Sequence, residues 1–227
     1  MKSSQAGRET AWARVWHTVR AYGLTLAVVN FMAGSPALAS DPIRILAFGD
    51  SLTAGYNLPS ADSFPVRLEK ALRAQGYAVS VQNAGVSGDT SAGGRARLDW
   101  ALAGKPQVAI VELGANDGLR GLDPGQMREN LDVILTRLGD RGVKVLLTGM
   151  LAPSNYGRDY AERFRRIFPE LAEKHKAALY PFFLDGVATR PDLNQPDGLH
   201  PNAKGVEVIV EHILPHVKQL LDNVTTG

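Results

Sequence analysis

Four short polar segments contain residue types that can cleave a carbonyl compound: GDSL at 49–52, NAGVSGDT at 83–90, GAND at 114–117 and DGLHPN at 197–202. Ser51 lies in the first segment, and a serine hydroxyl becomes a strong nucleophile only when a base removes its proton. An apolar stretch precedes Ser51, which predicts a strand-to-helix turn that exposes the hydroxyl and the N–H group. The alternative is that Ser51 only caps the helix that follows.

The fourth segment supplies a candidate base together with its partner. Asp197 precedes His200 by three residues, so its carboxylate can hold the Nδ1–H group and leave Nε2 free to accept a proton. Gly198 and Pro201 keep this backbone out of a regular helix. The alternative is an Asp-Gly turn with an incidental surface histidine. We take Ser51, Asp197 and His200 as the candidate catalytic residues.

The second and third segments supply candidate donors for a negatively charged oxygen. Gly88 has no side chain to keep its backbone N–H group away from a substrate. Asn116 has a side-chain amide that donates hydrogen bonds without titrating. With the N–H group of Ser51, they form a candidate oxyanion hole. The alternatives are a turn glycine at 88 and an Asx-turn at 116.

Strand-like and helix-like segments alternate along the chain and would position these residues. The predicted strands cover residues 43–48, 78–82, 108–113, 143–148 and 179–184. The predicted helices cover residues 64–75, 93–103, 124–138, 159–176 and 203–221, with Pro169 and Pro215 as kinks or breaks. This alternation predicts an α/β fold with a parallel sheet and helices on both faces, which binds ligands beyond the carboxyl ends of its strands. Three of the four polar segments directly follow a predicted strand.

Composition excludes several classes of protein. The chain has 227 residues, of which 44% are hydrophobic and 21% charged, so one globular domain with an ordinary core is expected. The absence of cysteine excludes a disulfide scaffold, a cysteine-ligated zinc site and a cysteine nucleophile. The net charge of +2 forms no basic stripe, so we expect no nucleic-acid partner. His212 and His216 are four residues apart but lack an accompanying carboxylate motif, which favours a solvated helix face over a metal site.

The first 39 residues are typical of a secretory signal peptide. A basic region is followed by the apolar run GLTLAVVNFM and then by Ala37-Leu38-Ala39, which predicts cleavage after Ala39. The run is short for a bilayer span of about 20 residues, so we expect no stable membrane insertion. An uncleaved anchor or a buried helix is the alternative. We therefore expect the folded domain at residues 40–227, located in the periplasm or secreted.

The order of the four segments resembles the GDSL, or SGNH, hydrolase family. GDSLTAGY, NAGVSGDTSAGG, ELGANDGLRG and DGLHPN match its four blocks in order and cover nearly the whole mature chain. The resemblance implies a three-layer, flavodoxin-like fold with a five-stranded parallel sheet, and serine hydrolase activity on esters and thioesters. It implies Ser51 as nucleophile, Asp197 and His200 as its partners, and oxyanion donors at Ser51, Gly88 and Asn116. It implies neither a metal nor another cofactor.

Further residues resemble a bacterial periplasmic subgroup of thioesterases, lysophospholipases and arylesterases. They are VELGANDGLRG, residues 153–157 and residues 180–184. The expected partner is therefore a small-molecule ester, thioester or lysophospholipid, and we expect a monomer. Asp50 and Asp117 are interpreted as loop braces, and Glu112 receives no catalytic role.

Apolar loop residues favour an acyl chain as the group bound near the site: Leu58, Leu119, Leu122, Tyr156 and Phe183. The candidate substrate-binding residues are Leu119, Asn155 and Tyr156, with residues 155–157 as a wall that could move about Gly157. Two alternatives remain open from the sequence. One is a deacetylase of cell-wall or other polysaccharides, and the other is a secreted binding module without turnover.

Overall fold

The computed structural model describes residues 41–225, so the predicted leader lies outside the described residues and stays a prediction. Within residues 41–225 one sheet has five parallel strands, in the order β2-β1-β3-β4-β5. The strands are β1 (Ile43–Gly49), β2 (Val79–Gly85), β3 (Val108–Glu112), β4 (Lys144–Thr148) and β5 (Ala178–Tyr180). The predicted α/β fold with a five-stranded parallel sheet is confirmed.

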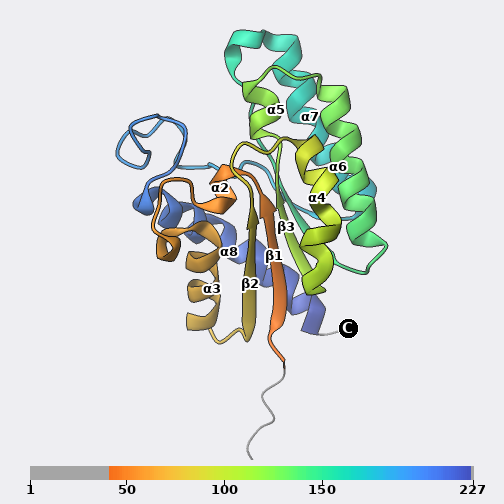
Figure 1. The fold of residues 1–227 in the computed structure, drawn as a ribbon, viewed down its shortest axis with the longest axis vertical. Helices are drawn as coiled ribbons and strands as arrows, with labels where there is room; N and C mark the ends of the chain where they lie inside the picture. Colours follow the sequence, from red (N-terminus) through yellow and green to blue (C-terminus); the bar gives the residue numbers. More distant parts are fainter. Residues whose placement is uncertain (1–40, 226–227) are drawn as a thin grey trace, which may run out of the picture. The chain divides into compact units, whose positions relative to one another are not determined.

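Long helices cover both faces of the sheet (Figure 1). One face carries α3 (Phe64–Ala74) and α8 (Ala203–Thr225), which contact each other, and the other carries α4 (Ser91–Ala101), α6 (Pro124–Gly139) and α7 (Arg158–His175). Short helices lie in the connections between these elements: α2 (Ser51–Ala54), η2 (Ser60–Asp62), η3 (Leu102–Gly104), α5 (Ala115–Leu119) and η4 (Ser154–Tyr156). In the described part of the chain, no helix combines the length and apolarity needed to cross a bilayer.

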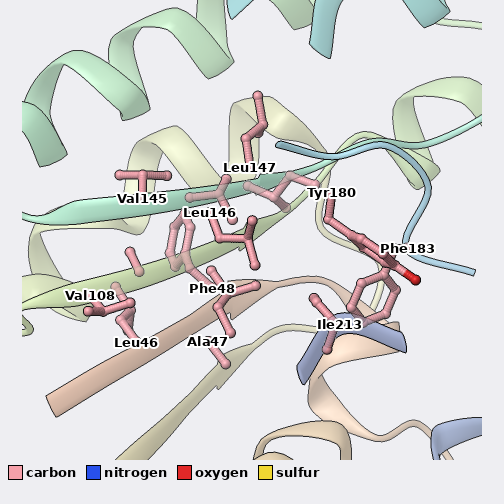
Figure 2. Packing of buried hydrophobic residues seen from close by; sticks show 14 of the residues in the cluster. Leu46, Ala47, Phe48, Val108, Val145, Leu146, Leu147, Tyr180, Phe183 and Ile213 are labelled. Carbon is pink, nitrogen blue, oxygen red and sulfur yellow. The ribbon is translucent and has the colours of Figure 1, made fainter. Parts of the chain in front are cut away.

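The central strands form the middle of the core. All five residues of β3 are buried, and so are the last five of β1, because helices cover both faces of these strands. Figure 2 shows Phe48 of β1 and Leu146 of β4 packed in this cluster. Ile213 of α8 and Phe183, which follows β5, belong to the same cluster. Phe183 is fully buried, and its ring meets the Phe64 ring edge-on at 5.1 Å. Its predicted place in a substrate-facing loop is therefore wrong.

Two predicted elements differ in detail from the structure. The fifth strand ends at Tyr180, because Pro181 has no N–H group to continue the ladder. The chain then bends back, and the N–H group of Phe183 donates to the carbonyl of Gly149 at 3.0 Å. Helix α7 is not divided at Pro169. Its buried apolar face, which includes Phe164 and Leu171, can offset a proline cost of about 3 kcal/mol, since each such side chain contributes about 1.5–3 kcal/mol.

The strand order determines where the polar segments meet. The chain runs from β1 outward to β2, and then returns past β1 to β3. The carboxyl ends of β1 and β3 therefore flank a topological switch point, where open α/β sheets bind ligands. Ser51 follows β1 and Asn116 follows β3, so the fold places both at this crevice.

Candidate active site

Ser51 is the first residue of α2, two positions after β1 ends. The cap of this helix is Asp50, whose carboxylate accepts the N–H group of Leu52 at 3.0 Å. The capping alternative for Ser51 is therefore not what the structure shows. The turn is tight, because a Cβ atom at Gly49 would lie 2.4 Å from the Glu112 carboxylate and 2.1 Å from the Thr53 hydroxyl. Close packing below the turn leaves the Ser51 hydroxyl free to meet His200.

A chain of hydrogen bonds joins Ser51, His200 and Asp197. The distance between Ser51 Oγ and His200 Nε2 is 3.0 Å, and that between His200 Nδ1 and Asp197 Oδ2 is 2.7 Å. The N–H groups of Leu199 and His200 donate to the other Asp197 oxygen at 2.9 and 3.0 Å. These backbone donors, and then the His200 side chain, lower the pKa of Asp197 to about 2. Asp197 is thus ionised at neutral pH and orients the imidazole so that Nε2 can take the Ser51 proton.

Two residues that sequence reasoning missed hold His200 in place. The Tyr56 ring packs against the imidazole with a centroid distance of 4.6 Å. The side-chain amide of Gln195 donates to the carbonyl of Tyr56 at 2.8 Å and to that of Pro201 at 3.0 Å. Its N–H group donates to the carbonyl of His200 at 2.7 Å. The motif GDSLTAGY contains Tyr56 and could have pointed to it, whereas no motif in the sequence points to Gln195.

The three candidate oxyanion donors follow the ends of three neighbouring strands: Ser51 begins α2 after β1, Gly88 lies in the loop after β2, and Asn116 lies in α5 after β3. In residues 41–225 no protein acceptor pairs with the N–H group of Ser51 or Gly88. Gly88 is exposed and has φ +83°, a conformation that other residues rarely adopt. The Arg120 guanidinium donates to its carbonyl at 2.8 Å. Asn116 donates one amide hydrogen to Asp50 at 3.0 Å, which leaves the second hydrogen available.

Two buried carboxyl groups lie beneath Ser51. Asp50 and Glu112 are fully buried, and Glu112 accepts from the Thr53 hydroxyl at 2.7 Å and from the Asp50 N–H group at 3.2 Å. Burial raises the pKa of Asp50 to about 6. Burial, and then the charge of Asp50, raises the pKa of Glu112 well above its ordinary value. Because two adjacent buried carboxyls oppose each other's ionisation, this pair favours the protonated form of Glu112.

The other predicted brace, Asp117, has a similar structural contact. Its carboxylate accepts the N–H group of Ser91 at 2.8 Å and the Ser91 hydroxyl at 2.6 Å, which ties α5 to the start of α4. These contacts match the predicted bracing role of Asp50 and Asp117. Glu112, which received no catalytic role from the sequence, belongs to the same support through its contacts with Thr53 and Asp50.

The candidate substrate-binding residues lie in two short helices, α5 and η4, that contact each other. Tyr156 donates its hydroxyl to the carbonyl of Leu119 at 3.0 Å. Its ring packs against Gly121, where a Cβ atom would lie 2.5 Å from it. Asn155 is exposed in η4, which ends at Gly157 with φ +85°. The structure brings Leu119 and Tyr156 together, and a binding role for these residues stays a prediction.

The two histidines of α8 have separate neighbours. His212 Nδ1 lies 3.4 Å from an Asp185 carboxylate oxygen, and the His216 ring lies 5.1 Å from that of Tyr180. No group of three or more acidic or histidine side chains in residues 41–225 could hold a metal ion.

Comparison with known proteins finds the model of the GDSL-like lipase/acylhydrolase family over residues 47–208. The chain is 43% identical over 178 residues to an esterase, TesA, of Pseudomonas aeruginosa, which covers 78% of this chain and 89% of that protein. It is 40% identical to an arylesterase of Vibrio mimicus, with 82% and 92% covered. It is 38% identical to thioesterase 1/protease 1/lysophospholipase L1 of Escherichia coli, with 82% and 88% covered.

Solved structures agree with these sequence relatives. The esterase AlinE4, of the SGNH-hydrolase family, has a TM-score of 0.67 and 51% identity, covering 79% of this chain and 97% of that one. The psychrotrophic esterase EstA of Pseudoalteromonas, in a structure inhibited by monoethylphosphonate, has a TM-score of 0.75 and 34% identity, covering 79% and 99%.

Proposed function

The chain belongs to the GDSL-like lipase/acylhydrolase family and is a carboxylic ester hydrolase; we propose that Ser51 is its nucleophile and that the reaction passes through an acyl-enzyme. The observation that carries this proposal is the hydrogen-bonded chain from Ser51 through His200 to Asp197. A serine with its base in hydrogen-bond reach, and a third group that orients the base, is the arrangement that activates a hydroxyl.

The proposed steps use groups already in position. His200 Nε2 takes the Ser51 proton as Ser51 Oγ attacks the carbonyl carbon, and the carbonyl oxygen becomes an oxyanion. The N–H groups of Ser51 and Gly88 and the free amide hydrogen of Asn116 hold that oxyanion. The imidazolium then protonates the leaving alcohol or thiol. His200 next activates a water molecule, which releases the acid and restores Ser51.

We infer an apolar acyl group as the part of the substrate that is recognised. Leu119, Leu122 and Tyr156 leave about two fifths of their surface exposed on loops at the carboxyl edge of the sheet. Large side chains of this kind favour an alkyl or aryl acyl group over the polar groove that a polysaccharide deacetylase needs. The relatives named arylesterase, thioesterase and lysophospholipase support aryl esters, acyl thioesters and lysophospholipids as the substrate classes to test.

We also propose that residues 1–39 direct export and that the enzyme works in the periplasm or outside the cell. The order of basic region, apolar run and Ala37-Leu38-Ala39 supports this proposal. Expression of the full chain in a Gram-negative host should yield a periplasmic protein whose N-terminal residue is Ser40. Activity retained in the cytosol on an uncleaved chain would contradict it.

The substrate class is tested by kcat/KM on p-nitrophenyl esters from acetate to palmitate, with Ser51→Ala as the control. We expect kcat/KM to rise from acetate toward medium chains and to vanish in Ser51→Ala. Efficiency confined to acetate and butyrate would contradict the apolar acyl site while leaving the serine mechanism intact. A fluorophosphonate that labels the wild type but not Ser51→Ala separates a hydrolase from a binding module.

A further inference from the structure

Arg97, on α4, joins three segments at the carboxyl edge of the sheet. Its Nη2 donates to the carbonyl of Gly49 at 2.8 Å, and its Nη1 donates to the carbonyl of Ala84 at 2.8 Å. Its Nε pairs with the carboxylate of Asp89, and both of these side chains are 17% exposed. One guanidinium therefore contacts the end of β1, the end of β2 and the loop that follows β2.

Two of these contacts are adjacent to the candidate oxyanion donors. Gly49 precedes Ser51 by two residues, and Asp89 directly follows Gly88. The carbonyl of Gly49 also accepts the N–H group of Val86, at 3.0 Å, so the two loops already meet at this atom. Arg97 therefore connects the peptide just before the Ser51 N–H group with the side chain of the residue just after Gly88.

We propose that Arg97 is a positioning residue that sets the geometry between the N–H groups of Ser51 and Gly88. Arg97 contacts backbone carbonyls, the Asp89 carboxylate and the Phe48 ring, and it acts through the segments that it connects. The inference rests on the proposed function, because it assigns the two N–H groups to the oxyanion. The expected consequence is that Arg97 affects the bound transition state more than the bound substrate.

The contacts require a guanidinium rather than any positive charge. Its three nitrogens donate in three fixed directions, toward Gly49, Ala84 and Asp89. Its plane also lies over the Phe48 ring, with Cζ 4.3 Å from the ring centroid. A lysine ammonium is a compact point charge that cannot reproduce this fork. Arg97→Lys keeps the charge and can keep one contact, but it releases the other two.

Arg67, on α3, provides a matched control, because it also forms ion pairs between separate segments but lies away from the oxyanion loops. It pairs with Asp62 and with Glu207 of α8, and its side chain is 26% exposed. Arg67→Lys therefore removes a guanidinium network without touching either oxyanion loop. A purely structural role of Arg97 predicts that both variants lose thermal stability and that neither changes turnover in the folded enzyme.

The test compares wild type, Arg97→Lys and Arg67→Lys by kcat and KM on one p-nitrophenyl ester, by the rate of phosphonylation and by thermal midpoint. We expect kcat of Arg97→Lys to fall roughly 10–100-fold with KM within about twofold, because a misplacement of about 1 Å can cost 10²-fold. The rate of phosphonylation falls in parallel, since the phosphonyl oxygen uses the same donors. Arg67→Lys keeps kcat within about twofold.

Wild-type kcat and phosphonylation in folded Arg97→Lys would overturn the inference, and so would an equal loss in Arg67→Lys. If Arg97→Lys does not fold, Asp89→Asn takes its place, because it weakens the same bridge from the loop side. Its kcat must fall with KM unchanged, and an unchanged kcat there overturns the inference as well. Wild-type enzyme that is not labelled at Ser51 would instead contradict the proposed function, whatever Arg97 does.

Discussion

The two halves of the active site are built in different ways. The turn that carries Ser51 packs against buried polar side chains. These are Asp50, Thr53 and Glu112, which are between 0% and 1% exposed. His200 and Asp197 lie on a loop between β5 and α8, where the Asp197 side chain is 37% exposed. The proposed nucleophile is thus positioned by close packing at a strand end, whereas the proposed base is positioned by hydrogen bonds within its own loop and by the Tyr56 ring.

Aspartate has a raised pKa in one half of the site and a lowered pKa in the other. Burial raises the pKa of Asp50 to about 6, whereas backbone N–H donors lower that of Asp197 to about 2. A carboxylate that must orient an imidazole has to stay ionised, and hydrogen bonds on the exposed loop achieve this. A carboxyl that only supports a turn can share a buried site with a second one. Environment rather than residue type therefore assigns the two roles.

The largest expected effect is the loss of kcat when Ser51 is replaced, compared with the smaller loss when Asp197 on the other half is replaced. Ser51→Ala should lower kcat by roughly 10⁶-fold and Asp197→Ala by roughly 10⁴-fold, because a misoriented base still accepts a proton. Steady-state kinetics on a p-nitrophenyl ester measures both, with thermal midpoints to confirm folding. Equal losses in the two variants would mean that His200 has no function without Asp197, and the proposed difference between the halves would fail.

The next effect tests the donor that links to the buried half. Asn116→Ala should lower kcat by about 10²–10³-fold, the usual cost of one lost oxyanion donor. KM should change little, because the charge on the oxygen develops only in the transition state. Asn130, which donates to the Ser91 hydroxyl at 3.2 Å, offers a control amide on α6. A loss confined to KM in Asn116→Ala would remove Asn116 from the oxyanion hole.

A smaller effect concerns the connection between the two halves. Gln195→Ala removes the side-chain hydrogen bonds to the carbonyls of Tyr56 and Pro201, each with a net contribution of about 1 kcal/mol. We expect faster amide hydrogen exchange at Leu199 and His200 than in wild type, because the loop opens more easily. Exchange around Ser51 should stay unchanged. Faster exchange in both regions would show that the halves unfold together.

The smallest effect is a change in how stability depends on pH. A carboxyl whose pKa is raised by folding keeps a proton that the unfolded chain has lost, so the free energy of unfolding falls as pH rises above about 4.3. Glu112→Gln removes this contribution. Its thermal midpoint should therefore fall less between pH 5 and pH 8 than that of wild type. Glu129→Gln, at an exposed position on α6, should behave like wild type.

Much of the fold and the positions of the polar segments could be predicted because both depend on local patterns. Continuous apolar runs mark strands buried on both faces, and the polar segments after 43–48 and 108–113 follow from them. Phe183 was misplaced because an apolar run after a strand looks the same in a loop and in a core. The contact between Gln195 and Tyr56 joins residues 139 positions apart, so no local pattern could reveal it.

The contact between Ser51 and His200 joins residues 149 positions apart. Bringing such distant residues together costs chain entropy, and non-local contacts of this kind slow folding. A chain in which the segment before α8 has not docked therefore lacks the hydrogen bond between Ser51 and His200. The proposed mechanism needs that bond, so such a chain should carry the serine without esterase activity.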